Sequence, residues 1–150
     1  MSDTTTNPSD NTPDLRDKTP NPALRQLDIL VGTWNVTTSD GGQGASDGQV
    51  SFEWMEGGFF LIQRFDLGRV RGVEYIGYDE ETDTLRSHVF STTGDLLPYT
   101  WQVKDGTLTI WYDTPGSPAY YKGTFTEDGN SYVGAWHWPG GGYEAAGSRA

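Results

Sequence analysis

The segment from Arg86 to Phe90 carries the residue types best suited to chemistry. Alternate side chains of an extended strand share a face, so Arg86, His88 and Phe90 would lie on one side of a sheet. A histidine that titrates near neutral pH can act as a general acid or base, and an arginine can bind a carboxylate or enolate oxygen. This pattern predicts catalytic roles for His88 and Arg86, the alternative being a histidine that is hydrogen-bonded across the interior. The competing inner face of this segment holds Leu85, Ser87 and Val89.

Aromatic residues make up 13% of the chain and recur at alternate positions in several extended segments. Each ring can belong to an ordinary core or line a cavity, and the whole set favours a partly open pocket for a small hydrophobic or aromatic molecule. Tyrosine hydroxyls in such a pocket would orient the ligand. The predicted ligand-binding residues are Phe52, Trp54, Tyr75, Phe90, Tyr99, Trp101, Tyr120 and Trp136.

The charge and the residue content exclude several classes of function. The chain has 21 acidic and 10 basic residues, a formal net charge of -11, which disfavours nucleic acid and anionic membranes as partners. It has no cysteine and two histidines, and the acidic run at 79–83 lacks the spacing of a calcium loop, so no metal site is expected. The polar first residues lack the basic and apolar regions of a signal peptide, which predicts a cytoplasmic protein.

The elements that must position these residues are short strands. From Gly32 onward, alternating or aromatic runs are separated by turn signals, and no helical period lasts for three turns. Asp105-Gly106 lies between two runs and predicts a tight hairpin, because both central positions of such a turn favour positive φ. The ten predicted strands are residues 33–38, 49–55, 59–67, 72–78, 85–91, 99–104, 107–112, 119–126, 131–138 and 143–149.

Ten strands joined by short turns predict an all-β domain over residues 21–150. A flat meander would leave two exposed edges, whereas closure removes the edges and places alternate residues inside. We therefore expect a ten-stranded antiparallel up-and-down β-barrel, with a two-sheet sandwich as the rival. Residues 1–20 contain one large apolar side chain, Leu15, and are expected to form a disordered polar tail.

A short helix is predicted ahead of the first strand. Asn21 can cap it, and Pro22 suits its first position because the missing N–H is not needed there. Ala23, Leu27 and Leu30 would then share one face of this helix. The helix should end at Gly32, where the chain becomes extended.

Residues 27–34, which read LDILVGTW, resemble the opening of the calycin superfamily, in which a short helix closes the barrel base and Gly-x-Trp begins the first strand. The chain also resembles a family of small bacterial domains of unknown function. That resemblance implies a lipocalin-like, distantly nitrobindin-like barrel, with no established reaction and no catalytic residues to carry over. In lipocalins the tryptophan packs beneath an arginine of the last strand, which implies that Arg149 stacks on Trp34. The matching pieces are 31–34 (VGTW), 52–59 (FEWMEGGF), 76–79 (IGYD), 90–94 (FSTTG), 123–129 (GTFTEDG) and 134–136 (GAW).

Nitrobindin-like barrels hold haem through one histidine on a late strand, and His137 is the residue nearest that place. Alternation places His137 outside the barrel, and Asn35 to Thr37 depart from the glycine pattern that follows the nitrobindin tryptophan, so no cofactor is expected. Three functions remain open. The preferred one is a barrel that binds a small hydrophobic molecule, the second is an isomerase or cyclase using His88 in the same pocket, and the third is a filled barrel that acts through its outer surface as a homodimer.

Overall fold

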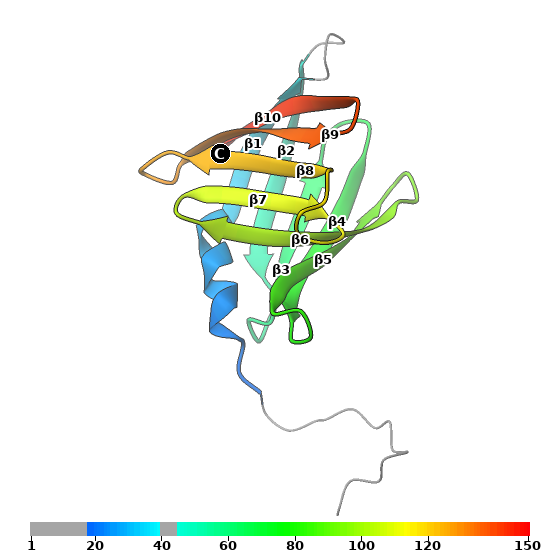
Figure 1. Cartoon of the computed structure of the whole chain (residues 1–150). Helices are drawn as coiled ribbons and strands as arrows, with labels where there is room; N and C mark the ends of the chain where they lie inside the picture. The colour runs from blue at the N-terminus through cyan, green and yellow to red at the C-terminus, as the bar shows by residue number, and fades with distance from the viewer. Residues whose placement is uncertain (1–17, 40–44) are drawn as a thin grey trace, which may run out of the picture.

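Ten antiparallel strands close into a barrel in the computed structural model, which describes residues 18–39 and 45–150 (Figure 1). Each strand pairs with the next along the chain, and the last strand pairs with the first. The predicted up-and-down barrel is confirmed, and all ten predicted strands are present. The strands are β1 (Gly32–Ser39), β2 (Ala45–Trp54), β3 (Phe60–Asp66), β4 (Arg71–Asp79), β5 (Thr84–Ser91), β6 (Leu96–Lys104), β7 (Thr107–Tyr112), β8 (Tyr120–Phe125), β9 (Ser131–Trp138) and β10 (Gly141–Arg149).

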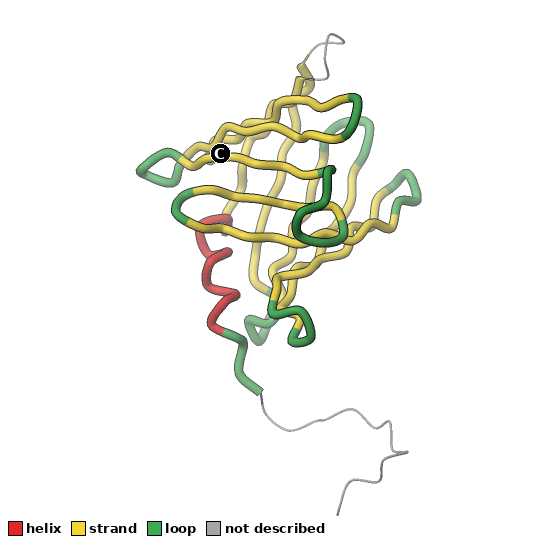
Figure 2. The backbone as a smooth tube through the Cα atoms, viewed as in Figure 1, coloured by secondary structure: helices red, strands yellow, loops and turns green. Residues whose placement is uncertain are grey.

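Short turns and loops join the strands from β2 to β10, as the green segments of Figure 2 show. The Asp105-Gly106 turn between β6 and β7 has φ values of 52° and 76°, so both central residues adopt the left-handed conformation predicted from their types. Of the expected disordered tail, residues 1–17 lie outside the described residues. The described part of the chain contains no helix with the length and hydropathy needed to cross a bilayer.

The predicted helix is a 3₁₀ helix, η1 (Pro22–Leu30), and it lies at one end of the barrel. The Asn21 side chain accepts a hydrogen bond from the Ala23 N–H at 2.9 Å, which confirms the predicted cap. The predicted face is wrong by one residue, because Leu24 rather than Ala23 is buried together with Leu27 and Leu30. A 3₁₀ helix has three residues per turn, so positions three apart form one row.

Contacts between the helix and the first and last strands stabilise the base of the barrel. Trp34 is fully buried and donates its Nε1–H to the carbonyl of Leu30 at 2.8 Å. The Arg149 guanidinium lies 4.2 Å from the centre of the Trp34 ring and donates to the carbonyls of Ile29 and Val31 at 2.7 and 2.8 Å. These bonds satisfy the carbonyls left over at the end of the helix, and they confirm the expected stacking of Arg149 on Trp34.

Strand alternation places one row of side chains from each strand inside the barrel. Val50, Phe52, Trp101 and Trp136 belong to these inner rows and face the interior. The bottom of the barrel, next to the helix, is solid core: Leu61, Ile76 and Leu85 have at most 2% of their surface exposed. The interior is less filled on the side away from the helix, and the candidate site lies there.

Candidate functional site

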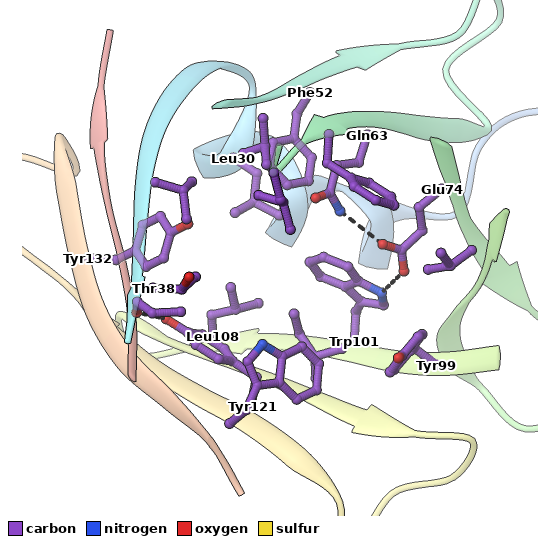
Figure 3. A pocket seen from close by; sticks show the side chains of 18 of the residues that line it. Leu30, Thr38, Phe52, Gln63, Glu74, Tyr99, Trp101, Leu108, Tyr121 and Tyr132 are labelled. Carbon is purple, nitrogen blue, oxygen red and sulfur yellow. Dashed lines mark hydrogen bonds between the residues drawn. The ribbon is translucent and has the colours of Figure 1, made fainter. Parts of the chain in front are cut away.

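A cavity of about 240 Å³ occupies the barrel interior (Figure 3). Every strand contributes at least one side chain to its wall, and Leu30 of the helix closes the lower end. Most of the lining is aromatic or aliphatic. Four predicted ligand-binding residues line it, which are Phe52, Tyr99, Trp101 and Trp136.

Glu74 on β4 is the one formally charged side chain among the described residues that line the cavity. It has 5% of its surface exposed, and three neutral donors from three other strands reach its carboxylate. Ser87 donates to Oε2 at 2.5 Å, the Trp101 Nε1–H donates to Oε2 at 3.1 Å, and Gln63 Nε2 donates to Oε1 at 2.9 Å. Figure 3 shows Gln63 and Trp101 meeting the carboxylate at the edge of the open space.

The surroundings of Glu74 change its acidity. Burial in the apolar interior raises the pKa of Glu74 from 4.5 to about 7, and the hydrogen bonds from Ser87 and Trp101 oppose that rise without cancelling it. No cationic side chain is among the partners of this carboxylate in the described residues. The cavity therefore contains one carboxyl group that exchanges its proton near neutral pH.

Tyrosines cover the wall formed by the last three strands. Tyr121 donates its hydroxyl to the carbonyl of Ala145 at 2.9 Å, and its ring lies over glycines of β8 and β9. A Cβ at Gly123 or Gly134 would lie 2.7 Å from the Tyr121 hydroxyl, so these two glycines make room for it. Burial raises the pKa of Tyr121, and it raises that of Tyr132 to about 12, so both stay protonated at neutral pH.

The predicted catalytic residues lie on the outer face of β5, so their placement in the pocket was wrong. Ser87 and Val89 point inward, and alternation turns His88 and Arg86 outward. His88 is exposed and Arg86 forms an ion pair with Asp113 at 3.2 Å. Ser87 is on the inner row of β5 and donates its hydroxyl to Oε2 of Glu74. The isomerase or cyclase alternative loses the acid/base residue on which it depended.

Four predicted ligand-binding residues do not line the cavity. Tyr75 and Phe90 are 38% and 45% exposed on the outside, where their rings meet edge to face. Tyr120 also faces outward and packs against His137 with ring centres 5.0 Å apart. Trp54 points inward but lies at the base, where its Nε1–H donates to Asp28 at 3.0 Å.

The residues present do not fit haem held by a histidine. His137 is exposed on the outer face, as alternation predicted, and His88 is exposed on the outer face of β5. Neither imidazole reaches the interior. In the described residues, no three histidine or acidic side chains lie close enough together to hold a metal ion.

Sequence reasoning missed Glu74, Gln63 and the tyrosine wall. A carboxylate in a strand is ordinarily expected on the solvent side. Adjacent residues of a strand point to opposite faces, so an outward Glu74 implies an inward Tyr75. One signal was available: Glu74 alternates with Gly72, Ile76 and Tyr78, a row with as much apolar character as its rival. Tyr120 and Tyr121 are adjacent and identical in type, so periodicity alone does not say which one faces inward.

No family model matches the chain, and no curated protein gives a significant match. Among solved structures the chain is similar to a redesigned β-barrel, with 18% sequence identity and a TM-score of 0.39 over 84% of this chain and 96% of that one.

Proposed function

We propose that the protein binds a small, largely apolar molecule of one or two rings inside the barrel. The observation that carries this proposal is the cavity of about 240 Å³ with its mostly aromatic and aliphatic wall. An apolar protein cavity of roughly 150 Å³ is large enough for benzene, and sites for drug-sized ligands begin near 300 Å³. A ligand between these two sizes fits.

The direction from which the ligand enters follows from how the two ends are built. The helix end is closed by buried leucines and by the contacts of Arg149 and Trp34. Thr38, Val89 and Tyr143 line the cavity toward the other ends of their strands. We place the mouth at that end.

A relationship to lipocalin-like calycins belongs to the same proposal. It is supported by the order of a short helix, a Gly-Thr-Trp start to β1 and an arginine of the last strand stacked on that tryptophan. Barrels of this size can hold a small ligand inside, and the cavity here suits that use.

Titration with 2-methylnaphthalene tests the proposal, with calorimetry and tryptophan fluorescence as readouts. Trp101 and Trp136 line the cavity, so a bound aromatic ring should change their emission. Val89→Phe places a larger side chain in the cavity and should weaken binding about tenfold or more, since it removes space that the ligand needs.

The control for this experiment is Val133→Phe, the same change on the outer face of β9, where Val133 is 66% exposed. It should leave binding unchanged. Lack of binding to the unmodified protein, or equal binding by Val89→Phe, would contradict a ligand in the lumen. Thermal unfolding of each variant establishes that it is folded.

A further inference from the structure

The cavity wall has an unbalanced charge. Glu74 is buried, with 5% of its surface exposed. No lysine, arginine or histidine is among the described residues that line the cavity with it. Its three partners are neutral donors, an amide, a hydroxyl and an indole. Carboxylates inside proteins are ordinarily paired with a cation or a metal. The described residues of the cavity wall therefore supply no positive charge to pair with the Glu74 carboxylate.

We infer that the ligand is an amine, with an apolar ring body in the aromatic part of the cavity and a protonated ammonium group hydrogen-bonded to Glu74. This inference rests on the proposed function, because it names the chemical class of the molecule that the same cavity holds. It assigns Glu74 the role of a ligand-binding residue that selects cations over neutral and anionic molecules of the same shape.

The hydrogen bonds already made by Glu74 leave one place for such a group. Each carboxylate oxygen can accept about two hydrogen bonds. Oε2 accepts from Ser87 and Trp101 and is filled, whereas Oε1 accepts from Gln63 alone. An ammonium group carries three N–H donors, and one of them can occupy the remaining position on Oε1 in a charge-assisted hydrogen bond.

The rest of the cavity favours a cation as well. Phe52, Tyr99 and Trp101 are part of its wall, and the faces of aromatic rings attract cations. An anionic ligand would meet the Glu74 carboxylate in a low-dielectric interior, where like charges repel strongly. The net charge of -11 adds attraction for cations at long range.

The titratable groups around Glu74 leave the carboxylate as the group that responds to pH near neutrality. β3 presents Gln63 and β5 presents Ser87 and Val89, none of which titrates. β6 presents Tyr99, whose pKa is raised to about 12 by burial and by the charge of Glu74. The charged residues of the helix, Arg25 and Asp28, are engaged with Trp54 at the base.

Three ligands of one shape test the inference: 2-naphthylmethylamine, 2-methylnaphthalene and 2-naphthoate, titrated by calorimetry at about pH 8. The ammonium compound should bind about tenfold or more tightly than the neutral one, the gain expected of one charge-assisted hydrogen bond, and the carboxylate should bind least. In Glu74→Gln most of this preference for the amine should be lost, and only the weaker attraction of the aromatic rings should remain. Glu144→Gln, the same change on the exposed side of β10, should keep the preference for the amine.

The pH dependence of ligand binding to the unmodified protein is a second test, and it needs no variant. Lowering the pH from about 8 to about 5.5 protonates Glu74 but leaves the amine charged, because an alkylammonium ion has a pKa near 10. The preference for the amine should then disappear. A preference for the amine that is undiminished in Glu74→Gln or at low pH overturns the inference.

The outcomes separate this inference from the proposal beneath it. If 2-methylnaphthalene binds and the amine binds no better, the barrel is a container for apolar rings and Glu74 has only a structural role. If none of the three ligands binds, the proposed function fails, and the amine inference fails with it.

Discussion

Glu74 shows at the scale of one residue how a barrel can keep a carboxyl group in its interior. Desolvation of the charged form is met by donors from β3, β5 and β6, which reduce the free-energy cost without removing it. The remaining cost appears as a pKa of about 7. The group is therefore easily protonated in the folded protein and holds a proton less tightly in the unfolded chain.

The stability of the protein should depend on pH through this residue. In the unfolded chain Glu74 has its ordinary pKa of 4.5, so between that value and about 7 the folded state binds the additional proton. The contribution of Glu74 is most favourable at pH values below 4.5, and it is lost as the pH rises through 7. The whole shift corresponds to about 3 kcal/mol.

Urea unfolding measures this dependence. The unmodified protein should lose free energy of unfolding between about pH 5 and about pH 8, and Glu74→Gln should flatten the curve in that interval. Glu144→Gln keeps the slope, since Glu144 is exposed. A slope that Glu74→Gln leaves intact would mean that another group carries it.

At the scale of elements, the helix η1 closes one end of the barrel. Its three buried leucines lie in one row, and its last carbonyls are bonded by Trp34 and by Arg149 from the two strands that close the barrel. A nine-residue 3₁₀ helix is long for its class, so most of its stability must come from these contacts.

Leu27→Ala tests the role of the helix. Leu27 has no exposed surface, so its truncation should lower the free energy of unfolding by about 2–5 kcal/mol. Val31→Ala, at a position 37% exposed, should cost less than about 1 kcal/mol. Equal small effects in chemical denaturation would show that the helix is not part of the cooperative core.

The close contact between β8 and β9 is a second feature at this scale. A Cβ at Gly134 would lie 2.3 Å from the Lys122 carbonyl oxygen and 2.5 Å from the Gly123 Cα, which are backbone atoms. Gly134→Ala must move the strands apart and should destabilise the protein by about 1–3 kcal/mol. Val133→Ala on the outer face is the matched control, and a Gly134→Ala protein as stable as the parent would show that this wall yields easily.

The elements were more predictable from sequence than the site. Turn residues such as Asp105-Gly106 and alternation within each strand are local, so ten strands and their order could be read directly. The inner face of β5 depends on Ser87 meeting Glu74 and Trp101, which come from β4 and β6. Such contacts depend on the register between strands, and the sequence of one strand does not specify it. Both faces of β5 carry polar and apolar residues, so the type of His88 does not reveal that it lies on the outer face.

At the scale of the whole molecule, a closed barrel with an internal cavity is part of a strongly acidic chain. All ten strands are paired on both sides, so the described strands present no free edge along their paired length. The formal charge of -11 is spread over the chain, whereas the cavity contains one carboxylate. Long-range attraction and short-range selection of a cation therefore come from different residues.

This division predicts how salt affects binding of 2-naphthylmethylamine. Its association rate should fall as ionic strength rises, because surface charges are screened over about 10 Å at 0.1 M salt. Glu74→Gln should keep that salt dependence of the association rate while losing affinity. Stopped-flow fluorescence measures both, and a rate independent of salt in the unmodified protein would exclude steering by the surface.

The pairing of β1 with β10 also constrains when the barrel can close. A ribosome makes the first strand early, but the partner that covers it and the arginine that holds the end of the helix are made more than a hundred residues later. Until then, Trp34 lacks the Arg149 side chain that covers its ring. The barrel can therefore close only after β10 has been synthesised, more than a hundred residues after β1.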